Sequence, residues 1–102
     1  MLPRRKVRSF FSEVLRYMET RVAVMSIIVE DPESAEQINA ILHDHGSFII
    51  GRMGIPYRKR GISIISIALD APQDVISALS GKIGKLPGVS VKTAYSGVVS
   101  KD

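Results

Sequence analysis

Two similar stretches, 40 positions apart, constrain the fold of this chain more than any other feature. They are MSIIVEDP (25–32) and ISIALDAP (65–72), which share the pairs Ser26 and Ser66, Ile27 and Ile67, and Pro32 and Pro72. Each is a strand-like run that ends in an acidic residue and a proline. A helical pattern, a glycine and another strand-like run follow each of them. The chain is therefore predicted to be strand–helix–strand, repeated.

The first unit predicts a strand over 21–29, rich in valine and isoleucine. Asp31 is expected to cap the following helix, with Pro32 at its first position, where a missing N–H costs nothing. The apolar residues of this helix then recur at spacings of three and four. Gly46 is predicted to end it in the left-handed conformation. A strand over 48–55, interrupted by Gly51 and Gly54, completes the unit.

The second unit predicts a strand over 61–69, a helix that Pro72 opens, and a stop at 86–88. The last strand is expected over 89–96, because its apolar and polar residues alternate. The polar segment YRKRG (57–61) suits a hairpin between the second and third strands.

This order predicts an α+β, ferredoxin-like βαββαβ domain over residues 18–102, with a four-stranded antiparallel sheet. Right-handed crossovers place both helices on one face and make strands one and three the central pair. A basic extension over 1–17 precedes the domain. It is expected to be a short amphipathic helix that docks on a partner, nucleic acid or an anionic membrane, a loose tail, or a segment upstream of a true initiator at Met18.

Both faces of the two central strands are predicted to be apolar. Val22, Val24 and Ile28 alternate with Ala23, Met25, Ile27 and Val29, and the third strand shows the same pattern. Two helices cover only one face of a sheet, and an uncovered face of an antiparallel sheet is normally polar. We therefore expect a homodimer or a tetramer that buries the second face. Coverage by the N-terminal extension is the alternative.

Composition excludes several classes of protein. The chain has no cysteine, which excludes disulfides, thiol catalysis and cysteine-bound zinc. No apolar run is long enough for a membrane helix, so we expect a cytoplasmic protein without membrane contact. The net charge of +4 comes from 1–17, with five basic residues and one acidic, whereas 18–102 holds nine of each. The body therefore lacks the positive field of a nucleic-acid binder.

His43, Asp44 and His45 are a candidate metal-binding group, and the chain has no other histidine and no cysteine. Two histidines two positions apart point about 200° from each other on a helix, so a regular helix cannot bring both to one ion. We expect His43 in solvent and His45 at the edge of the apolar face, with no bound metal or cofactor. No nucleophile elbow, P-loop or dinucleotide motif occurs, which argues against an enzyme.

Residues 21–96 resemble the iron-only hydrogenase system regulators. The resemblance rests on RVAVMSIIVEDPESAEQINAILHDHGSFIIGRMGIPYRKRGISIISIALDAP and on LPGVSVKTAYS. It implies an ACT-like fold, similar to the sensor domain of nickel-responsive repressors, and a regulatory role beside hydrogenase maturation proteins. The nickel function does not carry over, because FIIGRMGIPY and GISIISIAL contain no histidine or cysteine.

The resemblance also implies where a ligand binds. ACT-type sites lie between subunits, near the first strand–helix loop and the second strand, which corresponds to Asp31, Gly51 and Arg52. We therefore expect a non-enzymatic regulator that binds a small-molecule effector or docks on a hydrogenase-related protein. The alternatives are a transcription regulator that contacts DNA through its basic N-terminal arm, and a metal sensor that uses His43 and His45.

Overall fold

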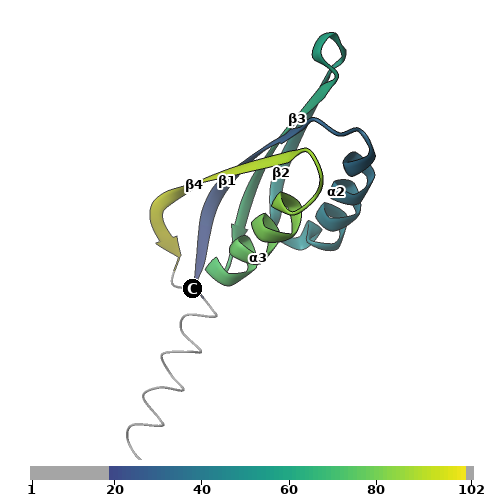
Figure 1. Cartoon of the computed structure of the whole chain (residues 1–102). Coiled ribbons are helices and arrows are strands. Elements are labelled where there is room, and N and C mark those ends of the chain that lie inside the picture. Colours follow the sequence, from purple (N-terminus) through teal and green to yellow (C-terminus); the bar gives the residue numbers. More distant parts are fainter. Residues whose placement is uncertain (1–18, 101–102) are drawn as a thin grey trace, which may run out of the picture.

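The structure, a computed structural model, describes residues 19–100 (Figure 1). The elements run in the order β1 (Thr20–Val29), α2 (Glu33–Asp44), η1 (Gly46–Phe48), β2 (Ile49–Tyr57), η2 (Arg58–Arg60), β3 (Ile62–Ala71), α3 (Gln73–Gly84) and β4 (Val89–Ser100). The predicted basic extension over 1–17 lies outside the described residues. Within the described range, no helix has the length and apolarity that crossing a membrane requires.

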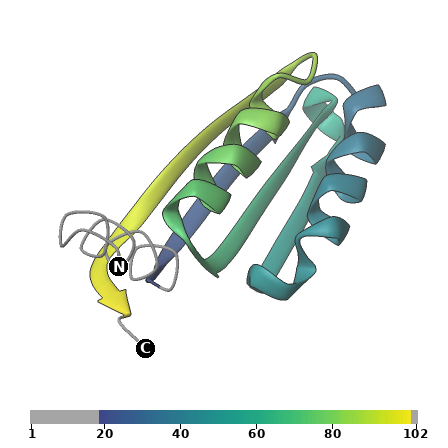
Figure 2. The same ribbon diagram turned by 90° about the horizontal axis from the view of Figure 1, so that it is seen from below.

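The four strands form one antiparallel sheet in the order β2-β3-β1-β4. Both helices pack on the same side of this sheet (Figure 2). The predicted ferredoxin-like fold and the central pair of β1 and β3 are therefore confirmed. The repeat that predicted the fold is visible in the register, where Ser26 of β1 lies directly opposite Ser66 of β3.

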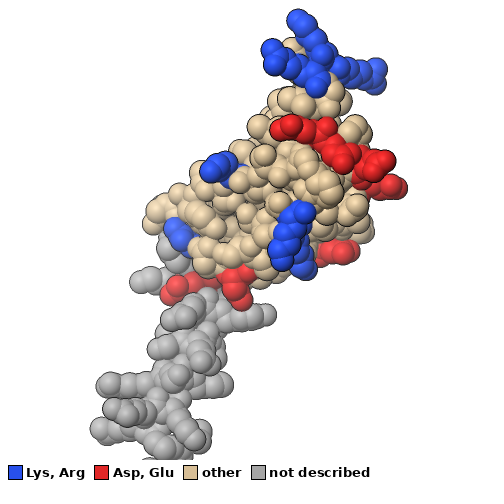
Figure 3. Space-filling model, in the orientation of Figure 1, with Lys and Arg blue, Asp and Glu red and all other residues tan. Residues whose placement is uncertain are grey.

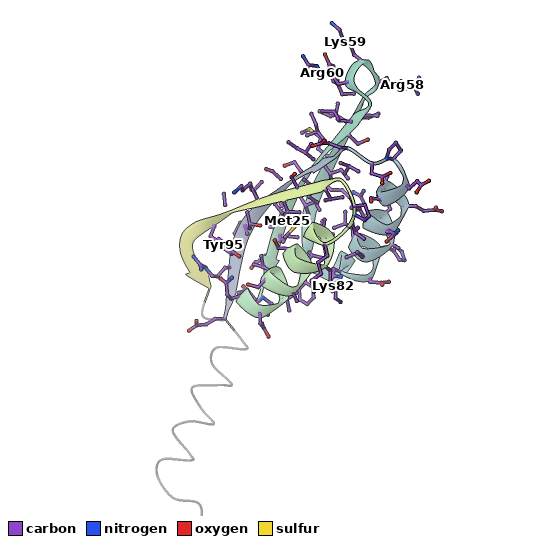
Figure 4. The ribbon with its side chains drawn as sticks, in the orientation of Figure 1. Met25, Arg58, Lys59, Arg60, Lys82 and Tyr95 are labelled. Carbon is purple, nitrogen blue, oxygen red and sulfur yellow. The ribbon has the colours of Figure 1, made fainter. Side chains whose placement is uncertain are left out.

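The core lies between the sheet and the helices, and strand alternation selects its members. In β1 every odd-numbered residue from Ala23 to Val29 is buried, and Met25 has no exposed surface (Figure 4). The helices contribute residues at helical spacing from one face each. The buried apolar set is Ala23, Met25, Ile27, Val29, Ile38, Leu42, Ile65, Ile67, Leu69, Ala71, Ile76, Leu79 and Ile83.

The start of α2 follows the predicted capping. Oδ1 of Asp31 accepts a hydrogen bond from the backbone N–H of Glu33 at 3.0 Å. Pro32 has helical dihedrals, φ −59° and ψ −26°. Asp31 thus satisfies one of the free N–H groups of the first turn, and Pro32 occupies a position where no N–H is needed.

The predicted left-handed end of α2 is wrong. Among the described glycines only Gly61 and Gly88 have positive φ, at 65° and 66°. The chain instead continues from Asp44 into the short 3-10 turn Gly46–Phe48, in which the N–H of Phe48 donates to the carbonyl oxygen of His45 at 3.0 Å. A tightened last turn satisfies helix-end carbonyls without a left-handed residue.

Strands β2 and β3 form a hairpin arm that extends beyond the helices (Figure 1). Its tip is the 3-10 turn Arg58–Arg60, which Gly61 closes in the left-handed conformation. The predicted hairpin at 57–61 is confirmed, although β2 runs to Tyr57 rather than stopping at residue 55. Pro56 is tolerated there because β2 is an edge strand, where a missing N–H breaks no ladder on the outer side.

The last strand is longer than its pattern predicted. Pairing of β4 with β1 resumes beyond a register shift between Arg21 and Ala23, so that Arg21 lies opposite Val99 and Thr20 opposite Ser100. Between these pairs β4 advances four positions while β1 advances two, so β4 carries two extra residues at this irregularity and bends there. The pairing is interrupted at that point, and the alternation pattern therefore did not predict the last part of the strand.

Candidate functional site at the open face of the sheet

The surface of the sheet opposite the helices, here called the open face, carries the main exposed apolar area of the described residues. β1 contributes Val22, Val24 and Ile28 to it, and β3 contributes Ile64. The edge strand β2 adds Met53, Ile55 and Tyr57. Their exposed fractions are 41% for Val22, 42% for Val24, 43% for Ile28, 37% for Ile64, 53% for Met53, 44% for Ile55 and 42% for Tyr57.

The register arranges these side chains in rows across the strands. Ile55, Ile64 and Ile28 form one row over β2, β3 and β1. The adjacent row holds Met53, Ser66, Ser26 and Lys92, and the next holds Gly51, Ala68, Val24 and Ala94. The open face is thus apolar with two central serines and few charges, a composition suited to burial against another surface.

A shallow hollow lies at one end of the open face, between β1 and β4. Val22, Val24 and Ala94 line it together with Ala23, Tyr95 and Ser96. It occurs where the bulge shifts the register between these strands. Its walls are largely apolar, so an apolar side chain of a partner fits it better than a charged ligand.

Asp31 lies at the corner between β1 and α2, and its role there is structural. Besides capping Glu33, it packs against the loop before β4, since a β-carbon on Gly88 would lie 2.8 Å from that of Asp31. A carboxylate that accepts a helix N–H keeps other lone pairs for a ligand. The predicted ligand role of Asp31 remains a prediction.

Gly51 and Arg52 lie near the opposite end of β2 and point to different faces. Gly51 pairs with Ala68 on the open face, just after a register shift that leaves Ile50 as the bulged residue. Arg52 pairs with Ile67, on the helix side, and its Nη2 donates to Oδ1 of Asn39 on α2 at 2.9 Å. No described atom lies within 4 Å of a β-carbon placed on Gly51.

The structure does not bring the three predicted ligand residues together within one protomer. Gly51 is level with Ala68 and hence with Val24, which precedes Asp31 by seven residues. At about 3.3 Å per residue this is a separation of roughly 20 Å along the sheet. A small ligand therefore cannot touch Asp31 and Gly51 of the same protomer at once.

The two histidines also differ in their surroundings. Nδ1 of His45 lies 2.8 Å from the carbonyl oxygen of Ile41, and the ring is half-buried, whereas His43 is exposed. This agrees with the placement predicted from helical spacing. In the part of the chain that the structure describes, no three side chains of His, Cys, Asp or Glu gather closely enough to hold a metal ion.

A polar cluster on the helix side went unrecognised in the sequence. The guanidinium carbon of Arg21 lies 4.7 Å from the centre of the Tyr95 ring. Arg21 Nη1 donates to Oε1 of Gln73 at 2.9 Å, and Nε2 of Gln73 donates to the Tyr95 hydroxyl at 3.0 Å. The cluster ties β1, α3 and β4 together. No local sequence pattern predicts this cluster, because the irregular pairing of β1 and β4 determines which residues of β4 lie near Arg21.

Comparison with known proteins identifies the family. Residues 21–93 match the TM1266-like family, described as "Iron-only hydrogenase system regulator, putative". The solved structure of the uncharacterized protein TM1266 from Thermotoga maritima is similar, with 36% identity and a TM-score of 0.72 over 74% of this chain and 96% of that chain.

A more distant structure shares the fold alone. A formyltetrahydrofolate deformylase from Pseudomonas putida KT2440 is 10% identical, with a TM-score of 0.55 over 72% of this chain and 28% of that enzyme. No curated protein matches. The match over 21–93, together with the identity to TM1266 over nearly all of that chain, shows that the present chain belongs to the TM1266-like family of iron-only hydrogenase system regulators.

Proposed function

We propose that this chain is a non-enzymatic, cytoplasmic regulatory domain of the iron-only hydrogenase system that works as a homo-oligomer. An effector or a protein partner binds where the copies meet. The observation that carries the proposal is the open face, on which seven large apolar side chains are each 37–53% exposed. A monomer in water normally presents polar residues on such a face.

The open face is large enough for a specific interface. Four strands at a spacing of about 4.8 Å and seven residues at about 3.3 Å give a footprint of roughly 450 Å² per copy. Two copies packed through it bury on the order of 1,000 Å², the lower bound for specific interfaces. A twofold axis in the contact plane places the same side chains on both sides, so the apolar rows match one another.

A second copy is a better occupant than the N-terminal extension of the same chain. The family match begins at residue 21, and 96% of TM1266 lies within the aligned part. That relative therefore has the same fold but almost no residues outside the aligned part that could cover the open face. A covering that serves both proteins has to come from another molecule, and a second copy is always present at equal concentration.

An interface of this kind provides a route to regulation. A ligand bound between copies stabilises the assembled state over the separated one and shifts the population accordingly. The separation of Asp31 from Gly51 and Arg52 in one protomer favours a ligand position between protomers over one inside a single chain.

Sedimentation equilibrium over a wide range of protein concentrations tests the assembly. The wild type is expected to associate, and Val24→Lys is expected to be monomeric, because a lysine in the middle of the apolar rows has no partner there. Gln37→Lys on the exposed side of α2 has the same charge change and is expected to associate like the wild type. A monomeric wild type at every concentration contradicts the proposal.

A thermal-shift screen tests the effector. The panel holds the common amino acids, several nucleotides, and Ni²⁺, Zn²⁺ and Fe²⁺. A ligand at one hundred times its Kd stabilises by about 2.7 kcal/mol, which moves the Tm of a domain of this size by roughly 10 °C. We expect a shift with an amino acid that Arg52→Ala abolishes. A shift with a metal that His43→Ala and His45→Ala abolish points instead to a metal sensor.

A further inference from the structure

The hairpin tip concentrates positive charge far from the body of the domain. Arg58, Lys59 and Arg60 are consecutive, exposed and located at the end of the arm (Figures 3 and 4). From residue 46 to residue 69 the chain has four basic residues and no acidic one. Since residues 18–102 are neutral in sum, the remainder of the domain is acidic by the same amount.

An acidic patch lies at the same end of the sheet. It consists of Glu30, Asp31, Glu33 and Glu36, at the corner between β1 and α2 and in the first turn of the helix. Glu30, Glu33 and Glu36 are exposed. Val29 pairs with Ser63, so the patch starts level with the root of the arm, below the hairpin tip (Figure 3).

The tip and the patch do not neutralise each other within one protomer. No hydrogen bond or ion pair among the described residues involves the side chains of Arg58, Lys59 or Arg60, or those of Glu30, Glu33 or Glu36. The tip is held away from the patch because the arm continues the sheet outward (Figure 1). Each protomer therefore presents two clusters of opposite charge at one end of the sheet, with no ion pair between them.

We propose that the hairpin tip of one copy seats on the acidic patch of a second copy, with the reciprocal contact formed at the same time. This inference rests on the self-assembly proposed above and adds a second contact to it. A twofold axis between the two ends brings tip to patch twice, because each protomer carries both members. Copies joined through their open faces in pairs would be joined by this contact into tetramers.

The charge distribution favours this partner over nucleic acid. A phosphate backbone that extended from the tip along the domain would also meet the four carboxylates, because the patch lies at the same end of the sheet, below the tip (Figure 3). The patch would then offset the attraction of the tip for a polyanion. A second copy offers carboxylates to the tip and guanidinium groups to the patch, so both clusters gain a partner of opposite sign.

Charge reversal tests the contact between the tip and the patch. A mixture of two variants with opposite reversals serves as the positive control. Arg58→Glu with Arg60→Glu makes both clusters acidic, and Glu30→Lys with Glu33→Lys and Glu36→Lys makes both basic, because only Asp31 then remains acidic in the patch. Each variant alone is expected to weaken association at this contact by about tenfold or more in the association constant. An equimolar mixture restores complementarity at both contacts, so it is expected to assemble like the wild type in sedimentation velocity.

The control is Lys82→Glu with Lys85→Glu at the end of α3, which has the same charge change as the tip variant and is expected to assemble normally. Far-UV circular dichroism and Tm confirm folding of each variant. A wild type that is monomeric at all concentrations overturns the self-assembly itself. A wild type that assembles while the reversed variants also assemble unchanged overturns only the tip–patch contact. Loss of binding to a duplex oligonucleotide in the tip variant, with assembly unchanged, identifies the tip as a nucleic-acid contact and overturns the proposal.

Discussion

The backbone N–H of Glu30 donates a hydrogen bond of 2.7 Å to the carbonyl oxygen of Gly88. The loop that follows β1 thus touches the loop that precedes β4, and a β-carbon on Gly88 would lie 2.8 Å from both the backbone nitrogen and the β-carbon of Asp31. The corner that presents the acidic patch is therefore fixed by a contact between backbones that only a glycine permits.

Gly88→Ala is expected to destabilise the domain by about 2–4 kcal/mol, since it adds a steric clash to the strain of a left-handed alanine. Gly61→Ala is the control, because Gly61 has nearly the same φ but no described atom within 4 Å of an added β-carbon. The free energy of unfolding of Gly61→Ala is expected to fall by about 1–2 kcal/mol. Urea denaturation measures both, and equal losses would show that the contact with Asp31 does not matter.

Ser34→Ala is expected to reduce the free energy of unfolding by about 1–2 kcal/mol. The hydroxyl of Ser34 is buried and donates to the carbonyl oxygen of Pro87 at 2.7 Å, which links α2 to the loop before β4. The better helix propensity of alanine offsets roughly 0.5 kcal/mol of the loss. The exposed Ser47 serves as control, with Ser47→Ala expected to stay within about 0.5 kcal/mol of the wild type in the same denaturation.

Ile27 and Ile28 are adjacent residues of the same kind on opposite faces, the first fully buried and the second 43% exposed. Ile27→Ala is expected to cost about 2–5 kcal/mol at every protein concentration, because it leaves a cavity in the core. Ile28→Ala is expected to cost less than about 1 kcal/mol in the dilute protein, where no interface forms. The destabilisation by Ile28→Ala should grow with protein concentration over the range in which the wild type associates. A concentration-independent result for Ile28→Ala would mean that its side chain is outside the interface.

Gly51→Ala is expected to change the stability of the dilute protein by less than about 0.5 kcal/mol, since an added methyl group there meets open space at a permitted φ. In the assembled protein the same methyl group would crowd whatever packs on β2. We therefore expect weaker association or weaker effector binding in Gly51→Ala, measured by sedimentation and by thermal shift. Gly97→Ala, also in open space but on β4, is the matched control.

Much of the fold could be predicted because its signals are local. The repeat of MSIIVEDP and ISIALDAP, the capping pair of Asp31 and Pro32, and the glycine that closes the hairpin each depend on a few neighbouring residues. The left-handed Gly46 was predicted wrongly because helix ends have two common solutions, a left-handed glycine and a 3-10 turn, and the same residue suits both. The candidate site residues Asp31, Gly51 and Arg52 came from an analogy rather than from a local pattern, and their role in ligand binding stays a prediction.

The sequence by itself determined the order of the elements, the apolar character of both faces of the central strands, and the charges of the arm and of the acidic patch. These follow from periodicity and composition, which tertiary contacts do not alter. Only the tertiary structure decided that Gly51 lies on the open face and Arg52 on the helix side, that Arg21 stacks on Tyr95, and that the basic tip and the acidic patch share one end of the sheet. Register shifts and long-range pairing fix those relationships, and a one-residue bulge is enough to reverse the face on which a side chain lies.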